Sequence, residues 1–257
     1  MKKIPKVKEY LILIKEGYSL KSKIAIFFHF FTLPLHFLCK NPNHLIFDVT
    51  LKNKDGIFFC GDNIFSVLCG STSYKTETRE YFNLNKGVFI DIGANIGKYT
   101  VIVGKRLKNT GEVVTIEPEK YNFKVLKKNV ELNKLENVLL ENVACFSDNR
   151  DLDLYLNPIR RGQHSIIINK HDKVKIKARR LDDILSDLCI RDIKLIKIDV
   201  EGAESNVLKG ATDTLKRYHP NIIFEAWNEN YLGKVRDVLT PFNYEIKRIS
   251  DKDYFAF

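Results

Sequence analysis

The chain has 257 residues, of which 44% are hydrophobic and 11% are aromatic, with only 7 Pro. This composition excludes an intrinsically disordered chain, and the length suits one large domain or one domain with an extension. Lys and Arg number 42 against 32 Asp and Glu, a formal net charge of +10. Eight Lys against Glu9 and Glu16 give residues 1–40 a net charge of +6, so only +4 remains for the rest of the chain.

The cysteine pattern and the N-terminus indicate a reducing compartment. Five cysteines lie far apart without a C-x-x-C pair, which disfavours a structural zinc site or a disulfide framework. The first apolar run, from Leu11 to Ile14, is too short for a signal peptide. We therefore expect a cytoplasmic protein, with peripheral membrane contact through residues 1–40 as an open alternative.

A Phe-rich segment, IAIFFHFFTLPLHFL, spans residues 24–38. It is shorter than the roughly 20 residues of a membrane-spanning helix, and Pro34 would disturb it. As a helix, it would carry one narrow, weakly polar stripe formed by Ala25, His29, Thr32 and His36. We interpret the histidines as the polar edge of this helix. The helix is expected to dock on its own domain, on a partner subunit, or at a bilayer surface where Lys21 and Lys23 face anionic headgroups.

The next segment has a β-hairpin pattern. Residues 45–60 form two strand-like runs around Asn53-Lys54-Asp55-Gly56, and residues 64–69 form another strand-like stretch. We assign residues 1–73 to an N-terminal extension of helical segment and hairpin, and residues 74–257 to the main domain.

From residue 88 short apolar strands alternate with helical patterns. The predicted strands are 88–91, 112–117, 137–144, 193–199 and 221–225, and the predicted helices are 96–108, 119–134, 181–188, 203–217 and 229–239. An irregular excursion over residues 145–178 contains two alternating runs, DLDLYL and KVKIKA. Strands that are apolar throughout and separated by helices predict an α/β fold with a doubly wound, mostly parallel sheet. At the C-terminus, FNYEIKRI and DYFAF are so close in sequence that they must pair antiparallel.

The first strand of this alternation ends in the loop Asp91-Ile92-Gly93-Ala94-Asn95-Ile96-Gly97. A dinucleotide domain would have G-x-G-x-x-G here, but Asn95 replaces the middle glycine, and a Walker lysine-serine pair is also missing. An acid before a glycine-rich turn suits a phosphate-free ligand with a cationic reactive end, which points to S-adenosylmethionine. Gly93 and Gly97 would let the backbone approach its amino-acid part, and Asp91 would accept hydrogen bonds from it directly or through water.

Glu117 follows at the end of the second strand, 26 residues after Asp91. A carboxylate at this position can accept hydrogen bonds from both ribose hydroxyls of the cofactor. The alternative is a solvated acid with no ligand.

Five segments carry a resemblance to a known family: DIGANIG, IEPEKYNFKVLKKNVELN, NVACFSD, LDDIL and LIKIDVEGAESNVLKGA. They are similar to the FkbM family of class I S-adenosylmethionine-dependent methyltransferases, over roughly residues 74 to 228, with KIDVEGAE as the most specific part. The resemblance implies a Rossmann-like sheet of seven strands with an antiparallel last strand. It also implies methyl transfer to a hydroxyl of a sugar, polyketide or similar small molecule.

The resemblance also places the cofactor on named residues. Asp91, Gly93, Asn95, Gly97 and Glu117 fall on its cofactor motifs, and Asn142 and Ala144 fall near the adenine. With their neighbours, the predicted cofactor-binding residues are Asp91, Gly93, Ala94, Asn95, Gly97, Glu117, Pro118, Asn142, Ala144 and Asp199.

Candidate catalytic residues follow the fourth and fifth strands of the alternation. Methyl transfer requires alignment of the acceptor oxygen with the methyl group, and an alcohol must also lose its proton to a general base. Asp199 is expected to contact cofactor or substrate, and Glu201 or Glu225 to act as the base; the simpler interpretation is that the acids from Asp199 to Glu204 stabilise the N-terminus of the next helix.

Two further assignments concern the same region. His164, on the excursion, is another candidate base because its ordinary pKa is about 6.5, although such a residue is commonly a surface histidine. In a variant of the mechanism, Asp199, Glu225 and Asn228 would bind a divalent cation, but our main assignment contains no metal.

Two other functions stay open. The net charge of +10 favours nucleic-acid methylation, but Asp199-Val200-Glu201-Gly202 stands where base-amino methyltransferases usually have Asn or Asp followed by Pro-Pro-aromatic, so this partner is disfavoured. The chain could also be a non-catalytic, membrane-docked module of the same fold. The expected acceptor is a small molecule, a glycan or a lipid-linked compound, recruited through residues 1–40, and a homodimer is possible.

Overall fold

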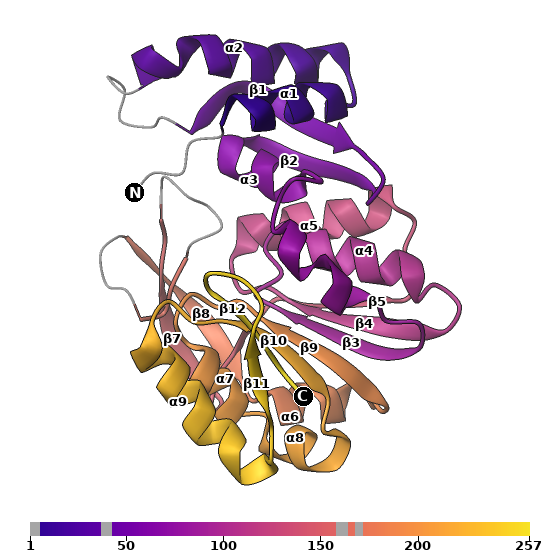
Figure 1. Ribbon diagram of the computed structural model, residues 1–257, viewed down its shortest axis with the longest axis vertical. Coiled ribbons are helices and arrows are strands. Elements are labelled where there is room, and N and C mark those ends of the chain that lie inside the picture. The colour runs from indigo at the N-terminus through magenta and orange to yellow at the C-terminus, as the bar shows by residue number, and fades with distance from the viewer. Residues whose placement is uncertain (1–5, 37–42, 158–163, 168–171) are drawn as a thin grey trace.

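The computed structural model describes residues 6–36, 43–157, 164–167 and 172–257 (Figure 1). A central sheet with helices on both faces forms the lower part of the view, and the N-terminal elements lie together at its upper end.

The central sheet has seven strands in the order β11-β12-β10-β9-β3-β4-β5. Only β12 runs against its neighbours, because it pairs antiparallel with both β10 and β11. The strands are β3 (Gly87–Ile92), β4 (Gly111–Ile116), β5 (Val138–Glu141), β9 (Ile193–Ile198), β10 (Asn221–Glu225), β11 (Ile246–Arg248) and β12 (Asp253–Ala256). The fold prediction, including the antiparallel hairpin at the end, is therefore confirmed.

Helices cover the sheet on both faces because its strands are apolar on both sides, and every residue of β3 is buried. They are α4 (Lys98–Arg106), α5 (Lys120–Leu132), α6 (Leu181–Asp187), α7 (Glu204–Lys209), α8 (Thr212–Tyr218) and α9 (Glu229–Leu239), followed by the 3-10 turn η2 (Thr240–Phe242). The single helix predicted over 203–217 is wrong, since α7 ends before Gly210 and α8 begins after it. A Cβ at Gly210 would lie 2.0 Å from the carbonyl oxygen of Phe146, so glycine at this position lets the backbone between the two helices contact the backbone at Phe146.

The excursion folds into a second, three-stranded sheet. Its strands are β6 (Ala144–Cys145), β7 (Arg150–Tyr155) and β8 (Lys173–Arg179), in the order β6-β8-β7. Both alternating runs are thus strands, paired antiparallel with each other. The strand predicted over 137–144 is divided, because residues 142–143 leave the central sheet before β6 joins the small one.

The N-terminal elements are α1 (Val7–Glu16), α2 (Leu20–His36), β1 (His44–Lys52), β2 (Ile57–Asn63), α3 (Ile64–Gly70) and the 3-10 helix η1 (Thr76–Phe82). The predicted hairpin is confirmed, with Asn53 and Gly56 exchanging backbone hydrogen bonds of 3.0 and 3.2 Å across its turn. The strand predicted over 64–69 is wrong, since this segment is α3. The Asn63 side chain begins the helix by accepting hydrogen bonds from the amides of Phe65 and Ser66. Helix α1 and helix η1 were not predicted.

Helix α2 docks on α1 and β1 through the stripe that was predicted to be its polar edge. Ala25 and His29 are buried, and His29 Nδ1 lies 2.7 Å from the hydroxyl of Tyr10 on α1. Small side chains and one satisfied histidine let the helix approach β1 closely, while several Phe side chains face outward. The polar edge that contains His29 is therefore the docked side of the helix; the side chain of His36 lies outside the described residues. Among the described residues, no helix is both long and apolar enough to cross a membrane.

The N-terminal elements share a hydrophobic core with the α5 side of the main domain, which includes Phe58 and Val67 together with Val125 and Leu126. Two asparagine side chains, at Asn129 on α5 and at Asn133 directly after it, hydrogen-bond to the free edge of β2. Asn129 accepts a hydrogen bond of 2.7 Å from the Phe59 amide and donates one of 3.0 Å to the Phe59 carbonyl. Asn133 likewise accepts a hydrogen bond from the Ile57 amide and donates one to the Ile57 carbonyl. The domain boundary at residue 74 stays a prediction, since the packing is continuous across it.

Candidate active site

A cavity of about 570 Å³ opens at the carboxyl ends of β3, β4 and β9. Ligands bind at this position in open α/β sheets, and the volume suits a drug-sized molecule. The described residues that line it are Ile92, Gly93, Asn95, Ile116, Glu117, Pro118, Asn122, Ala144, Cys145, Leu154, His164, Ile166, Asp199, Val200 and Glu201.

Eight of the predicted site residues meet in this cavity. They are Gly93, Asn95, Glu117, Pro118, Ala144, His164, Asp199 and Glu201. Five others do not line it: Asp91, Ala94, Gly97, Asn142 and Glu225. No ligand tests these assignments, so all thirteen stay predictions. Asp91, Gly97, Asn142 and Glu225 also have roles in the fold.

The glycine loop brings the ends of β3 and β9 together. Gly93 has φ 72°, and a Cβ on it would lie 2.0 Å from the carbonyl oxygen of Asp199. Gly97 has φ 83° at the start of α4, where a Cβ would lie 2.4 Å from Leu126 Cδ1. Only glycine fits either position, so the first opens the cavity floor while the second lets α4 pack against α5.

Asp91 is fully buried beneath this loop. Its Oδ2 accepts hydrogen bonds of 3.0 Å from the Thr100 amide and 2.7 Å from the Thr100 hydroxyl, and its Oδ1 lies 3.2 Å from Lys197 Nζ. Asp91 therefore anchors α4 to β9. The predicted direct contact between this carboxylate and the cofactor has no support in the geometry.

Glu117 lines the cavity at the end of β4. Its two carboxylate oxygens accept hydrogen bonds from the amides of Asn95 (2.8 Å) and Glu119 (2.9 Å), which fix the side chain. Burial raises its pKa to about 7, so the carboxyl is partly protonated near neutral pH. Asn142 supports the same turn from behind by donating to the carbonyls of Glu117 (2.8 Å) and Pro118 (3.1 Å).

The loop after β9 places two glutamates differently. Glu204 turns back on its own loop and accepts 3.2 Å hydrogen bonds from the amides of Val200 and Gly202, so it fixes the loop that precedes α7. Glu201 lines the cavity and has φ 55°, an uncommon conformation for glutamate. Burial, followed by repulsion from Asp199 and Glu225, raises the pKa of Glu201 to about 9. At this pKa Glu201 is mostly protonated at pH 7.

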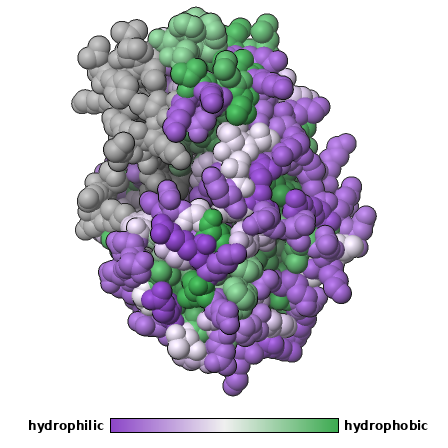
Figure 2. All heavy atoms as spheres, in the orientation of Figure 1, coloured by the Kyte–Doolittle hydropathy of each residue, from purple (hydrophilic) through white to green (hydrophobic). Residues whose placement is uncertain are grey.

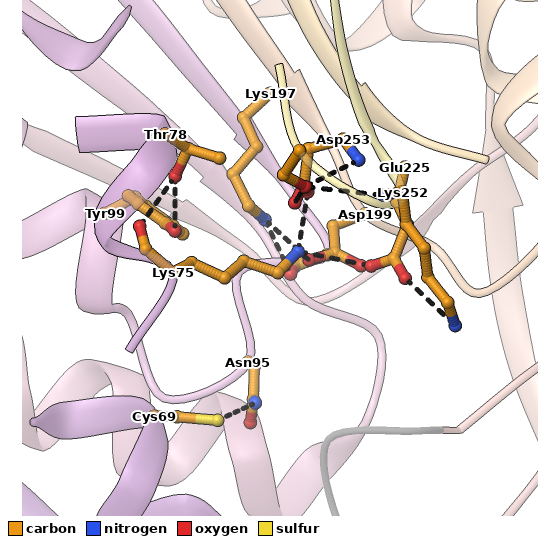
Figure 3. A network of polar contacts seen from close by, with 12 residues as sticks. Cys69, Lys75, Thr78, Asn95, Tyr99, Lys197, Asp199, Glu225, Lys252 and Asp253 are labelled. Atoms are coloured by element: carbon orange, nitrogen blue, oxygen red, sulfur yellow. Dashed lines mark hydrogen bonds and ion pairs between the residues drawn. The ribbon is translucent and has the colours of Figure 1, made fainter. Parts of the chain in front are cut away.

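A lysine that sequence reasoning missed neutralises the acids at the end of the sheet (Figure 3). Lys75 Nζ lies 2.8 Å from Asp253, 3.2 Å from Glu225 and 3.4 Å from Asp199. Although burial opposes its charge, Asp199, Glu225 and Asp253 keep the pKa of Lys75 well above its usual value.

Lys197, on β9, lies 3.9 Å from the same Asp199. Burial would raise the pKa of Asp199, but Lys75 and Lys197 hold it below the usual value. Lys197 lies within the apolar strand IKLIKI, and a lysine in such a strand indicates a buried ion pair. Lys75, which precedes η1, gave no such sign.

The Lys75 cluster lies beside the main cavity, in a smaller one of about 220 Å³. Asp199 lines both cavities and so connects them. Glu225 lines only the smaller one, where its second oxygen lies 3.9 Å from Lys252. This position makes Glu225 a poor candidate for the general base.

The proposed cation trio is not assembled. The Asn228 side chain begins α9 by accepting hydrogen bonds from the amides of Asn230 and Tyr231, while Lys75 occupies the carboxylates of Asp199 and Glu225. Over the described residues, no group of three or more His, Cys, Asp or Glu side chains is arranged to hold a metal ion.

His164 faces the cavity from the excursion. Its Nδ1 accepts a hydrogen bond of 2.9 Å from the Asn157 amide, so in the neutral ring the proton sits on Nε2. In this state the ring donates a hydrogen bond and cannot accept a proton at Nε2.

The strand order, the glycine loop and the cavity at the carboxyl edge together define a class I methyltransferase fold. Residues 91–246, more than half of the chain, match the family model described as the methyltransferase FkbM domain. The chain therefore belongs to the FkbM methyltransferase family, as the sequence motifs predicted.

Two curated relatives are similar to the chain. "Methyltransferase 1" of Beauveria bassiana is 24% identical over 157 residues, 53% of this chain and 63% of that protein. "Methyltransferase sdnD" of Sordaria araneosa is 28% identical over 200 residues, 65% of this chain and 77% of that protein. The matched region is thus less than two thirds of the Beauveria protein. A crystal structure of methyltransferase FkbM from Methylobacillus flagellatus KT aligns with a TM-score of 0.49 and 17% identity, covering 98% of this chain and 58% of the other.

Proposed function

We propose that the protein transfers a methyl group from S-adenosylmethionine to a hydroxyl of a small, glycan or lipid-linked acceptor. The observation that carries this proposal is the set of carboxyl groups that line the main cavity. Glu117, Asp199 and Glu201 line it, and none of the described lining residues is Lys or Arg. Carboxyls with raised pKa values can lose their protons beside a cationic ligand, whereas a phosphate would keep them protonated, which favours a sulfonium cofactor over a dinucleotide.

The residues present fit this cofactor. Glu117 is held by two backbone amides, and each carboxylate oxygen has a second lone pair for a ribose hydroxyl. The backbone at Gly93 and Asn95 would hold the amino-acid part, and Ala144 and Asn122, which also line the cavity, would contact the adenine. When bound, the cofactor supplies an electrophilic methyl group.

Among the candidate bases, the geometry favours Glu201. Its carboxyl faces the cavity, and its raised pKa makes the ionised form a strong base for an alcohol proton. A nearby sulfonium would favour this ionised form. His164, with its proton on Nε2, is suited to orient the acceptor oxygen by donating a hydrogen bond to it.

Isothermal titration with S-adenosylhomocysteine tests the cofactor assignment. Glu117→Gln should weaken binding by roughly 10 to 100-fold, because it removes a charged acceptor of two ribose hydroxyls. The matched control is Glu112→Gln, which changes an exposed glutamate on the same strand and should leave binding unchanged. Equal affinity for both variants and the unmodified protein would refute the cofactor assignment.

Methyl transfer into a fractionated cell extract tests the acceptor. With radiolabelled cofactor, we expect label in the glycan, lipid-linked or small-molecule pool, and we expect it to resist mild alkali because methyl ethers do so and methyl esters do not. Label that enters the nucleic-acid pool and is released by nuclease would instead favour the nucleic-acid alternative.

A further inference from the structure

The described residues carry a concentrated apolar surface at the N-terminal end of the molecule. Of the fifteen exposed large hydrophobic residues, ten lie between residues 7 and 47. We call this surface the N-terminal apolar face: Val7, Leu11, Tyr18, Leu20, Ile24, Phe27, Phe28, Phe31, Ile46 and Phe47. Figure 2 shows hydrophobic atoms gathered at the top of the molecule, over α1 and α2. Clustering of this kind marks an interaction surface rather than scattered surface residues.

Helix α2 has two opposite apolar sides. Its inward side, with Ser22, Ala25, Ile26 and His29, is buried against α1 and β1. At about 100° per residue, Leu20, Ile24, Phe27, Phe28 and Phe31 fall within an arc of about 100° on the other side. These five side chains are between 39% and 74% exposed, so packing among the described residues uses the inward side of α2 and leaves the outward side uncovered.

Basic side chains flank this outward side. The same helical geometry places Lys21 beyond one edge of the arc and Lys23 beyond the other. Lys21 Nζ also lies 4.6 Å from the ring centroid of Phe47, which joins β1 to the same surface. On α1, Lys8 and Lys15 are exposed beside Leu11.

The charge around the α1 and α2 part of the face is mainly positive, since the carboxylates near it are the half-buried Glu9 and the exposed Asp48 of β1. Within residues 6–36 five lysines are exposed, and of the two glutamates Glu16 is buried. A second copy of the chain would bring the same lysines face to face and would be repelled. An anionic lipid surface complements the lysines and offers an apolar layer for the Phe side chains.

We propose that the N-terminal apolar face binds peripherally to the surface of an anionic lipid bilayer. Helix α2 would lie in the plane of the headgroups, with Phe27, Phe28 and Phe31 reaching the acyl boundary and the lysines facing lipid phosphates. The inward side of α2 stays packed on β1, so docking needs no rearrangement of the domain. This inference concerns a surface remote from the cavity and does not depend on the proposed reaction.

Vesicle co-sedimentation of the full chain tests the proposal, with vesicles of phosphatidylcholine alone and of phosphatidylcholine mixed with phosphatidylglycerol. We expect binding to the mixed vesicles and a partition coefficient at least about tenfold lower for pure phosphatidylcholine. Phe28→Ser with Phe31→Ser should lower the partition coefficient for mixed vesicles by about tenfold or more, because two half-exposed aromatic rings are lost. Lys21→Gln with Lys23→Gln should lower it less, and added salt should reproduce that loss.

Val174→Ser is the matched control, since Val174 is an exposed apolar residue on β8, outside the face. It should bind vesicles as the unmodified protein does, and all variants should keep the same unfolding temperature. Absence of binding to mixed vesicles would overturn the proposal, as would binding that survives the double Phe substitution. Sedimentation equilibrium tests whether a second copy of the chain binds the face instead. A dimer that the double Phe substitution dissociates, in a protein that does not bind vesicles, would assign the face to self-association and overturn the lipid proposal.

Discussion

Two groups of carboxylates lie side by side at the carboxyl edge of the sheet, and they lose their charge in different ways. In the Lys75 cluster, Asp199, Glu225 and Asp253 surround a buried ammonium. In the main cavity, Glu117 and Glu201 have no ion pair with a described Lys or Arg, and burial raises their pKa values to about 7 and about 9. One group surrounds a lysine that the fold supplies, although burial and Asp199 still raise the pKa of Glu225 to about 7. The other group has protons alone to remove its charge.

This difference teaches which carboxylates are available to a ligand. An ammonium fixed by three carboxylates cannot leave without exposing buried charge, so the Lys75 cluster is part of the architecture. Protons, by contrast, leave readily when a cation arrives. The acids of the main cavity can therefore lose protons when a sulfonium binds, whereas the Lys75 cluster keeps its ion pairs.

The largest effect is expected at the proposed base. Glu201→Gln should lower kcat by about 10² to 10⁴-fold, because the acceptor hydroxyl loses its proton acceptor, while affinity for S-adenosylhomocysteine changes little. Steady-state kinetics with the acceptor found in the labelling experiment measure the change. Glu229→Gln, in the exposed first turn of α9, is the control; a Glu201→Gln variant with normal kcat would remove Glu201 from the mechanism.

The next effect concerns stability. Lys75→Met should lower the free energy of unfolding by ~3 to 5 kcal/mol at neutral pH, because it leaves buried carboxylates unpaired. Urea denaturation measures the loss, which should shrink in acid as those carboxylates become protonated. Lys252→Met removes the exposed partner of Glu225 and should cost less than about 1 kcal/mol. Similar losses for both variants would contradict the division between the two groups.

A smaller effect links pH to cofactor charge. Folded-state pKa values raised above the ordinary carboxyl value contribute stability that is complete in acid and is lost as the pH rises through about 7 and about 9. S-adenosylmethionine should restore this stability and neutral S-adenosylhomocysteine should not, so the difference between their melting-temperature shifts should grow from about pH 6 to pH 9. Thermal denaturation over this range checks it. A constant difference would show that Glu117 and Glu201 do not exchange protons for the sulfonium.

The smallest effect is expected from metal removal. Because Lys75 occupies Asp199 and Glu225 and Asn228 begins α9, neither EDTA nor added Mg²⁺ should change the methyl-transfer rate. An assay with and without chelator measures this. Loss of activity in EDTA that Mg²⁺ restores would show that a cation displaces Lys75 during turnover.

The sequence predicted most of the central sheet because its signals are local. Apolar strands of four to seven residues alternate with helical periodicity, so β10 and α9 were predicted at their observed residues and the terminal hairpin in its correct pairing. The glycine loop and Glu117 were likewise found at strand ends, where parallel topology concentrates ligands. Local patterns were insufficient for α3, where an apolar run at strand length became a helix under an Asn63 cap.

Tertiary structure alone decided which side chain meets which. Lys75 finds carboxylates 124 to 178 residues away along the chain, and no spacing in the sequence records that pairing. Asp91 is a second case: it was predicted to contact the cofactor, but its carboxylate contacts Thr100 and Lys197. Helix α2 is a third, because both of its sides are apolar and the sequence does not tell which one is buried. The sequence by itself determined a doubly wound parallel sheet and the position of its cavity, because alternating strands and helices give parallel strands, and its family motifs implied the methyltransferase fold. Only long-range packing decided which carboxylates remain open to a ligand and which side of α2 faces outward.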